Sequence, residues 1–444
     1  MNMTQNSFEE LKKKAQQFRL DTPQDRIARL QKLLNWVKTH EEEILKALEA
    51  DFNKPRFETT ISEIFPVITE IKYAIKNLKK WMRPQCVPTP MALIGHKSTI
   101  RRENKGVVLV IAPWNYPFNL AIVPLVSALA AGNTVVIKPS ELTPHTSMLI
   151  HRMAESIFSL DEVRVELGAK EKTEELLQYR FDHVFFTGST TVGRIIAKAC
   201  ADKLIPTTLE LGGKSPTIID ETANLDEAAD KIFWGKYLNR AQTCVAPDYL
   251  LVHESVADTL VQKIRTLSAG FDKENKGRII SPRHQERLQN MLNSPVDLNR
   301  QTLELVEIKN TSHPAMQDEV FGPVLPYLKY KNIDEIDAVI GAYEKPLSFY
   351  IFSNNKTRVN QILNKFPSGG VGINSVLVQF GNHNLPFGGV GHSGSGEYHG
   401  YHGFLEMSHA RAVIESRYFS FMRKILMPPY SPYKYKILDL IKNL

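Results

Sequence analysis

Residues 106–140 read GVVLVIAPWNYPFNLAIVPLVSALAAGNTVVIKPS, and this stretch decides the fold. A short apolar, β-branched run is followed by a polar turn, a helical stretch and a second run of the same kind. Continuous apolar runs of this length are typical of strands that are buried on both faces of a parallel sheet. Strand, helix and strand in this order predict a doubly wound α/β sheet.

The same texture continues on both sides of this stretch. Residues 7–82 carry Leu, Ile, Lys and Glu at the spacing of amphipathic helices, and a proline-rich break then precedes the strand-like KSTIRREN. A second α/β region is expected from about residue 214 to residue 406, with a domain boundary near LELGGKSP, residues 209–216. Further strands are expected in the runs RVEL, HVFFTGS, TTLEL and SPTIID, and in DYLLVH, PVLPYLKY, LSFYIFS and GVGIN.

Composition excludes several classes of protein. The chain has 444 residues, of which 43% are hydrophobic and 23% charged, as in ordinary globular proteins. The net charge is +7, but residues 411–444 alone carry +5, so the body is nearly neutral and has no basic stripe for nucleic acid. Three widely spaced cysteines indicate no disulfide framework and fit a reducing compartment. Without a secretory signal or an apolar run long enough to span a membrane, the chain is expected to be cytoplasmic, at most attached to one side of a membrane.

Polar side chains follow several predicted strands, where ligands bind on an open α/β sheet. Asn115 could donate a hydrogen bond to an oxyanion, or could simply start a helix. Gly188 and Ser189 would present backbone N–H groups to a phosphate at a helix N-terminus, although the pattern is not GxGxxG. Lys138 and Glu141 could hold ribose hydroxyls, whereas a surface ion pair is the commoner arrangement.

Two residues could carry the chemistry itself. Glu210 lies in an apolar strand just before Gly212 and Gly213, and a carboxylate in dry surroundings has a raised pKa that suits a general base. Cys244, in NRAQTCVAP, has so little charge around it that a small buried hydrophobic residue is the ordinary interpretation. The immediate neighbours leave both the structural and the chemical interpretation open.

Four histidines, His383, His392, His399 and His402, lie in a glycine-rich run near the C-terminus. Their spacings match no ligand pattern such as HExxH, and no cysteine accompanies them. We therefore expect no metal site.

Seven of these segments, in this order, resemble the aldehyde dehydrogenase superfamily. They are APWNYP, IKPSELTP, FTGST, LELGGKSP, QTC, EVFGPV and LPFGGVGHSG, which together cover roughly residues 100–410. The short N-terminus, the run QTCVAPDY and the ending LPFGGVGHSGSGEYHG look most like class 3, the fatty and aromatic aldehyde group.

The resemblance implies a fold of two doubly wound α/β domains and a small oligomerisation arm. A Rossmann-like dinucleotide-binding domain would comprise residues 1–82 and 104–211, and a catalytic domain would comprise residues 212–406. The arm and the C-terminal tail would comprise residues 83–103 and 407–444.

The resemblance also implies an activity, the NAD(P)-dependent oxidation of apolar aldehydes to carboxylic acids. Cys244 matches the nucleophile, which would form a thiohemiacetal and then a thioester, and Asn115 with the Cys244 backbone N–H would hold the oxyanion. Glu210 matches the base that activates water. Because a free thiol ionises little at neutral pH, we expect a lowered pKa for Cys244.

Cofactor and substrate positions follow from the same motifs. Lys138 and Glu141 would lie at the adenosine ribose, Gly188 and Ser189 at the pyrophosphate, and Glu319 and Phe321 at the nicotinamide end. Since the Glu141 charge repels a 2′-phosphate, we expect NAD as the cofactor, with NADP also accepted. The substrate channel would be lined by Tyr116, Asn119, Trp234 and Thr243.

The loop before the nucleophile departs from the family pattern. Ala241 stands where glycine is usual, and Arg240 beside it is also unexpected. If this position needs a glycine-like backbone angle, alanine would resist it.

Two rival enzymes remain in view. A CoA-acylating relative usually lacks the Glu210 position, and a cysteine hydrolase would need a histidine partner for Cys244. A small-molecule aldehyde and a second copy of the chain are the expected partners.

The tail predicts a helix with Ile437, Leu438, Leu440, Ile441 and Leu444 on one side. Packing on the partner of a homodimer is favoured, and contact with a membrane surface is the alternative.

Overall fold

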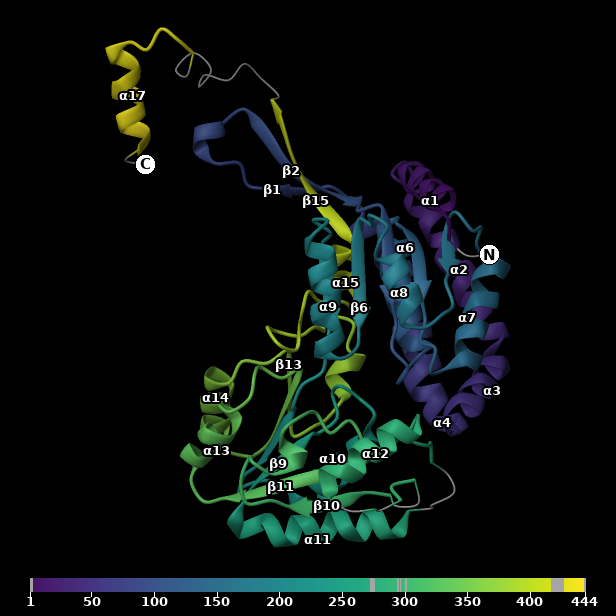
Figure 1. Ribbon diagram of the computed structural model, residues 1–444. Helices are drawn as coiled ribbons and strands as arrows, with labels where there is room; N and C mark the ends of the chain where they lie inside the picture. The colour runs from purple at the N-terminus through teal and green to yellow at the C-terminus, as the bar shows by residue number, and fades with distance from the viewer. Residues whose placement is uncertain are drawn as a thin grey trace.

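The computed structural model describes residues 3–271, 276–293, 295, 297–299, 302–416 and 427–442 (Figure 1). Its first sheet has the order β14-β7-β6-β3-β4-β5, with five parallel strands and an antiparallel edge at β14. These strands are β3 (Val107–Ile111), β4 (Thr134–Lys138), β5 (Val163–Val165), β6 (His183–Thr187), β7 (Thr207–Glu210) and β14 (Gly394–Ser395).

Helices cover both faces of this sheet. One layer packs through α6, whose thirteen residues are all buried because it lies between the sheet and other helices. Its members are α2 (Pro23–Thr39), α5 (Phe65–Trp81), α6 (Asn119–Ala131), α7 (Pro144–Ile157) and α15 (Gly400–Glu406). The other layer contains α1 (Gln5–Phe18), α8 (Lys170–Leu176) and α9 (Thr190–Ala201), and here Cys200 is a small buried hydrophobic residue. Two short helices, α3 (Glu41–Phe52) and α4 (Arg56–Thr59), connect α2 to α5.

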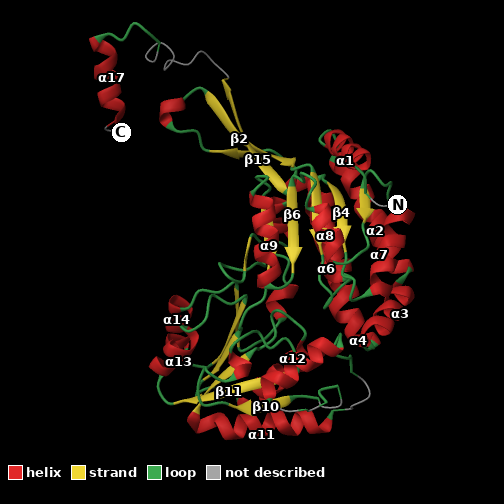
Figure 2. Ribbon diagram, in the orientation of Figure 1, coloured by secondary structure: helices red, strands yellow, loops and turns green. Residues whose placement is uncertain are grey.

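The second sheet is parallel throughout and has the order β10-β11-β9-β8-β12-β13. Its strands are β8 (Pro216–Ile219), β9 (Tyr249–His253), β10 (Glu304–Glu307), β11 (Val324–Tyr330), β12 (Ser348–Phe352) and β13 (Gly370–Ile373). Its helices are α10 (Leu225–Tyr237), α11 (Glu254–Gly270), α12 (Pro282–Leu292), α13 (Ile333–Ile340) and α14 (Lys356–Lys365). The carboxyl ends of the first sheet point toward this second unit, as the arrow of β6 shows in Figure 2.

A separate three-stranded antiparallel sheet projects from the far end of the first unit (Figure 1). It consists of β1 (Gln85–Val87), β2 (His96–Asn104) and β15 (Ser408–Ser416). Beyond it lies α17 (Pro432–Lys442), apart from both large sheets. The tail helix predicted from the sequence is therefore present, while Leu444 lies outside the described residues.

The predicted α/β fold is confirmed, and every strand expected from an apolar run is present. Four strands were not expected from the sequence: β1, β10, β14 and β15. Of these, β14 brings residues 394–395 back to the first sheet, although the predicted catalytic domain extends to residue 406. The division into domains otherwise stays a prediction. Within the described ranges no helix is long and apolar enough to cross a membrane.

Candidate active site

The site lies between the carboxyl edge of the first sheet and the amino edge of the second. From the first sheet come the loop after β3, with Asn115, the turn after β6, with Gly188, and the last residue of β7, Glu210. From the second unit come the segments that precede β9 and β11, which contain Cys244 and Glu319. These residues line one cleft of about 630 Å³. Parallel strands bring their ends to one edge, so residues far apart in sequence meet there.

A second cavity, of about 360 Å³, shares Cys244 and Glu210 with the cleft. All four predicted channel residues line it: Tyr116, Asn119, Trp234 and Thr243. The remaining wall is mostly apolar and includes Phe65, Leu120, Leu377, Val378, Phe380 and Phe387. The predicted nucleophile and base therefore lie where an apolar channel meets a more polar cleft.

The loop before Cys244 has an unusual backbone. Asn239, Arg240 and Ala241 have φ angles of 51°, 57° and 54°, so three successive residues without a glycine adopt the left-handed region. Such a conformation costs roughly 1–2 kcal/mol for each residue that carries a Cβ. The concern raised by alanine in place of glycine thus corresponds to a real strain in this loop.

Arg240 anchors the strained loop. Its side chain is buried, Nη1 donates to the Thr302 carbonyl at 2.9 Å, and Nη2 donates to the Leu298 carbonyl. Burial lowers the pKa of this guanidinium to about 10. The unexpected arginine is therefore a tether between the nucleophile loop and the segment before β10.

Amide groups connect this loop to Asn115. The Asn115 Nδ2 donates to the Gln242 carbonyl at 3.0 Å, and Asn239 Nδ2 donates to the Asn115 carbonyl at 2.8 Å. Asn239 is in turn held by Glu58, whose carboxylate accepts from its backbone N–H at 3.0 Å. The predicted oxyanion donor and the predicted nucleophile thus belong to one hydrogen-bonded unit.

A buried ion pair lies beneath this unit. Lys54 and Glu63 have fully buried side chains whose charged atoms are 2.7 Å apart. The Lys54 ammonium also contacts the Asn115 carbonyl at 3.4 Å and lies over the Tyr116 ring at 4.5 Å. Glu63 accepts the backbone N–H of Asn119 at 2.9 Å. Sequence analysis missed both residues because neither lies in a recognisable motif.

Burial raises the pKa of the Cys244 thiol, and the nearby Glu319 and Glu210 carboxylates raise it further. Backbone N–H groups of Cys244 and Val245 favour the thiolate but have the smaller effect. The predicted lowering of this pKa is therefore wrong. The prediction considered the local N–H groups, whereas the burial and the nearby carboxylates that raise the pKa are set by the fold.

Burial also raises the pKa of Glu210 well above its usual range, and Glu406 and Glu397 add to the effect. The side chain is 3% exposed, and among the described residues neither carboxylate oxygen has a hydrogen-bond partner. An unpaired carboxylate beside a thiol, at the junction of two cavities, is suited to accept a proton from water.

The cleft contains a helix N-terminus and a close backbone approach next to a buried carboxylate. Gly188 and Ser189 precede α9, where N–H groups and the helix dipole favour phosphate. At Gly212 a Cβ would come within 2.1 Å of the Glu319 carboxylate, so only glycine allows this approach. Burial raises the Glu319 pKa to about 8. Phe321 packs edge-on against Trp114 at 5.4 Å.

Lys214 and Arg287 fix the loop that carries Glu319. Lys214 forms a buried ion pair with Asp248 at 2.5 Å and donates to the Asp318 carbonyl at 2.9 Å. Arg287 donates to the carbonyls of Glu319 and Val320 at 3.0 and 2.6 Å. Neither cation was singled out in the sequence, although Lys214 lies within LELGGKSP.

Lys138 and Glu141 do not line the cleft. They form an ion pair at 3.0 Å in which Lys138 is buried at the end of β4 and Glu141 is 46% exposed. This is the arrangement that sequence analysis named as the commoner alternative. The end of β4 still lies beside β3, next to the other site loops.

The four histidines take different partners. The Arg194 guanidinium donates a hydrogen bond to His392 Nε2 at 3.0 Å, and His402 pairs with Glu397 at 3.1 Å. His383 and His399 line the channel near Glu70.

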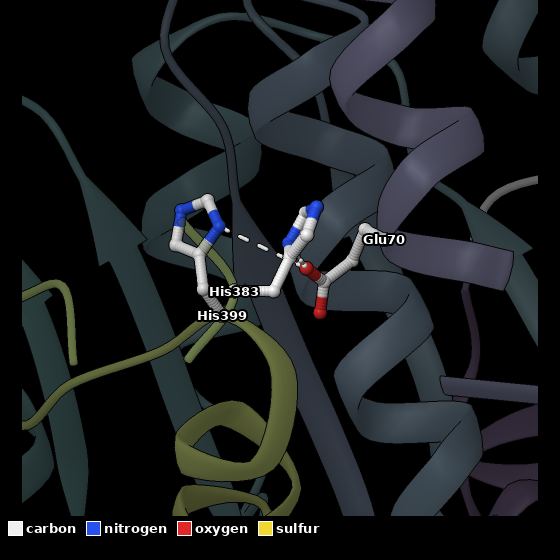
Figure 3. Close-up of side chains that lie close together, drawn as sticks. All are labelled: Glu70, His383 and His399. Carbon is white, nitrogen blue, oxygen red and sulfur yellow. Dashed lines mark hydrogen bonds and ion pairs between the residues drawn. The ribbon is translucent and has the colours of Figure 1, made fainter. Parts of the chain in front are cut away.

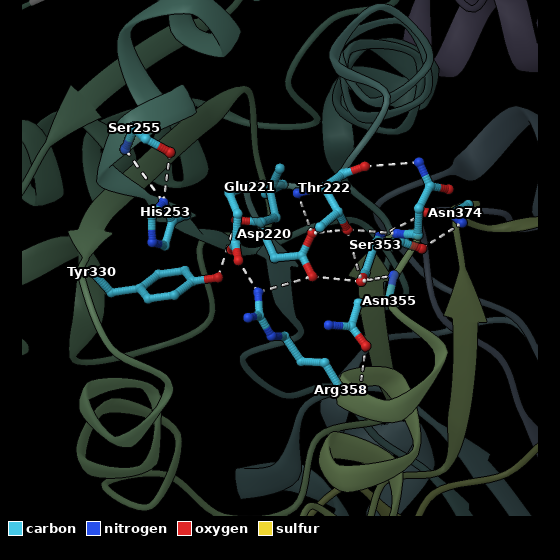
Figure 4. Close-up of polar contacts among 12 residues, drawn as sticks. Asp220, Glu221, Thr222, His253, Ser255, Tyr330, Ser353, Asn355, Arg358 and Asn374 are labelled. Atoms are coloured by element: carbon cyan, nitrogen blue, oxygen red, sulfur yellow. Dashed lines mark hydrogen bonds and ion pairs between the residues drawn. The ribbon is translucent and has the colours of Figure 1, made fainter.

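Another polar cluster occupies the opposite edge of the second sheet (Figure 4). Asp220 accepts hydrogen bonds from Thr222, Ser353 and Arg358 at 2.6, 2.5 and 3.2 Å. Both carboxylate oxygens of Asp220 therefore have hydrogen-bond partners, and none of the predicted site residues belongs to this cluster. We interpret the cluster as structural, since it connects the ends of neighbouring strands.

The geometry describes a protein of two α/β units that enclose a cleft containing a thiol and an unpaired carboxylate, arranged at the strand ends where α/β enzymes bind ligands. Comparison with known proteins agrees. Residues 4–413 match the model of the aldehyde dehydrogenase family. A 4,4'-diaponeurosporen-aldehyde dehydrogenase of Staphylococcus aureus is 42% identical, with 87% of this chain and 88% of that protein covered.

Two further relatives agree with this match. An aldehyde dehydrogenase family 3 member A2 of Macaca fascicularis is 39% identical over 92% of this chain and 88% of its own. The substrate-bound structure of Staphylococcus aureus AldH superposes with a TM-score of 0.94 at 40% identity, covering 99% and 100% of the two chains.

The chain belongs to the aldehyde dehydrogenase family. It is an NAD(P)-dependent aldehyde dehydrogenase that oxidises aldehydes to acids.

Proposed function

We propose that this enzyme oxidises apolar aldehydes, either medium- or long-chain aliphatic or aromatic, through a thioester on Cys244. The observation that supports this substrate class is the apolar channel, whose wall of aromatic and aliphatic side chains ends at Cys244 and Glu210. Such a wall favours a chain or ring over a charged aldehyde. The Staphylococcus aureus relative that is 42% identical to this chain is named for a particular aldehyde, 4,4'-diaponeurosporen-aldehyde.

In the first step the Cys244 thiolate forms a bond to the carbonyl carbon and the carbonyl π electrons move to oxygen. The Asn115 amide and the Cys244 backbone N–H then hold the oxyanion, and each donor of this kind contributes about 3 kcal/mol. Because the Asn115 amide has two N–H donors, one can stay on the Gln242 carbonyl while the other donates to the oxyanion. A bound NAD or NADP supplies the acceptor for the hydride that leaves the tetrahedral carbon.

In the second step Glu210 removes a proton from water, and the resulting hydroxide attacks the thioester carbonyl. The C–S bond breaks, the carboxylic acid leaves and Cys244 is regenerated. Glu210 is the buried, unpaired carboxylate at the junction of the two cavities, which supports hydrolysis over transfer to CoA.

For the cofactor we infer NAD as the preferred form with NADP accepted. Gly188 and Ser189 would face the pyrophosphate, Glu319 the nicotinamide ribose and Phe321 the nicotinamide. Lys138 and Glu141 would reach the adenosine ribose from the end of β4, where the Glu141 charge opposes a 2′-phosphate.

A homodimer is the proposed assembly. The strand β15 forms one edge of the arm sheet, and its residues from His409 to Ser416 are largely exposed. An exposed edge of this length is a template for pairing with a second chain. Peripheral contact of α17 with a membrane is the less favoured alternative.

The proposed function is tested by initial rates for straight-chain and aromatic aldehydes, each with NAD and with NADP, in the presence and absence of CoA. We expect higher kcat/KM as the apolar chain lengthens, NADH formation without CoA, and a preference for NAD. A strict requirement for CoA, or a preference for short charged aldehydes, would contradict the proposal. Ester turnover without NADH from any aldehyde would instead indicate a cysteine hydrolase.

A further inference from the structure

Two histidines and one glutamate lie close together (Figure 3), and both histidines line the apolar cavity. Glu70 lies in α5, His383 follows the short 3₁₀ helix Val378–Gly381, and His399 immediately precedes α15. One ligand atom from each lies within 4.8 Å of the others. The His383 Nδ1 is 2.7 Å from a Glu70 carboxylate oxygen, and the His399 Nδ1 is 3.8 Å from the same oxygen.

His399 is buried without a hydrogen-bond partner. It is 2% exposed, and within the described part of the chain neither ring nitrogen makes a hydrogen bond. The rings of Phe380, Phe387 and Tyr398 surround it, with centroids 4.7, 5.5 and 4.2 Å away. A buried polar group left unsatisfied costs about 1–3 kcal/mol, so this imidazole is placed for a ligand that none of the neighbouring side chains supplies.

We propose that Glu70, His383 and His399 bind a divalent transition-metal ion, zinc above all, in the wall of the channel. Two imidazoles with one carboxylate form a donor set that zinc prefers, and such sites keep a fourth position open. With metal–ligand distances of about 2.1 Å, tetrahedral ligands lie about 3.4 Å apart. The two imidazole-to-carboxylate spacings of 2.7 and 3.8 Å bracket that value, and all three ligand atoms lie within 4.8 Å of one another.

The carboxylate is already oriented by the protein. The other Glu70 oxygen accepts the Gly400 backbone N–H at 2.7 Å, and the His383 ring stacks on Tyr73 at 5.4 Å. Hydrogen bonds and packing of this kind around the ligands hold a metal site in shape. Sequence analysis expected no metal because it compared only spacings among the histidines, whereas Glu70 is 313 residues from His383.

The position of the proposed metal site would affect binding of the aldehyde. His383 and His399 line the same cavity as Cys244, so a zinc ion with a water in its fourth position would bring charge and volume into an apolar channel. Bound zinc would therefore compete with the aldehyde. This consequence rests on the proposed function, while the binding of zinc does not.

Binding is measured by equilibrium dialysis of the full chain against zinc. The Cys244→Ala variant serves as background, because the thiol is itself a zinc ligand. We expect one zinc per chain, with affinity reduced more than about tenfold by either His399→Gln or Glu70→Gln. His402→Gln is the matched control, since His402 pairs with Glu397 and lies outside the cluster, and it should bind normally.

Absence of binding in the Cys244→Ala background, or equal binding by all variants, would overturn the proposal. If Glu70→Gln does not fold, the comparison of His399→Gln with His402→Gln decides by itself. Cobalt provides a second measurement, because its visible spectrum should report nitrogen and oxygen ligands without sulfur, and a thiolate spectrum would place the ion elsewhere.

The kinetic consequence is tested with the zinc-free enzyme that retains Cys244. Added zinc should raise KM for a long-chain aldehyde with little change in kcat, and His399→Gln should remove that part of the inhibition. Zinc binding without competition would overturn the consequence alone. If the zinc-free enzyme oxidised no apolar aldehyde, the proposed function would fail and the dialysis result would still stand.

Discussion

Cys244 lies where burial and the Glu319 and Glu210 carboxylates oppose ionisation of its thiol. Burial also raises the pKa of Glu210, which would activate water, well above its usual range. Both groups must be ionised to act, because a thiolate attacks the aldehyde and a carboxylate takes the proton from water. The activity is therefore governed by two acids whose pKa values are raised.

The sign of the pH dependence follows from these two shifts. The ionised fraction of an acid below its pKa rises about tenfold for each pH unit. We predict that kcat/KM for an aldehyde increases from pH 6 to pH 9 without a plateau near neutrality. Initial rates at saturating NAD across this range measure it, and a profile that falls above pH 7 would contradict the assignment of Cys244 as the nucleophile.

Arg240 is expected to matter for stability as well as rate. We predict that Arg240→Ala lowers the free energy of unfolding by about 2–4 kcal/mol, because two carbonyls lose a charged donor and a buried side chain leaves a cavity. It should also lower kcat, since the tether holds the loop of Cys244. Thermal unfolding and steady-state rates test this, with exposed Arg56→Ala as control. Equal melting temperatures for the two variants would refute the role of the tether.

Among the elements, the segment between α4 and α5 has a special role. Residues Thr60–Ile64 form a π-helical turn, a local widening that often occurs at functional sites. This turn carries Glu63 to Lys54 and to the backbone of Asn119. The element thereby supports the channel and the Asn115 loop together.

We predict that Glu63→Gln destabilises the protein by about 3–5 kcal/mol, because the Lys54 ammonium is then buried without its charge partner. The double variant Lys54→Met with Glu63→Gln should recover more than half of this loss. Glu42→Gln, in an exposed ion pair with Arg56, should change stability by less than about 1 kcal/mol. Urea unfolding measures all three, and no recovery in the double variant would contradict the charge argument.

The strands expected from apolar runs are present for a physical reason. Val107–Ile111 and Thr134–Lys138 are buried on both faces, so composition alone identifies them. The short β14 pairs through its backbone and leaves almost no pattern. Residues that act through distant partners, such as Lys54 and Glu70, could not be found because their partners are set by the fold. Arg240 stood out in the sequence, but its role as a tether depends in the same way on distant carbonyls.

At the scale of the whole molecule, the arm sheet and α17 line neither of the two cavities of the site, so we expect them to act in contacts with a second chain. We predict a homodimer, with a mass by light scattering of twice the 50.4 kDa of the chain. In co-sedimentation with anionic liposomes, the full chain and a version ending at Arg417 should both stay in the supernatant. A monomeric mass would contradict pairing through β15, and sedimentation of the full chain alone would favour lipid contact by α17.

The central claim is that Cys244 becomes acylated and Glu210 releases the acid. Intact-mass analysis and peptide mapping of Glu210→Gln, after incubation with a long-chain aldehyde and NAD, test it most directly. The account predicts a burst of about one NADH per active site and an acyl group on the peptide that contains Cys244, both absent in Cys244→Ala. An unmodified Cys244 during turnover, or normal steady-state turnover by Glu210→Gln, would contradict it.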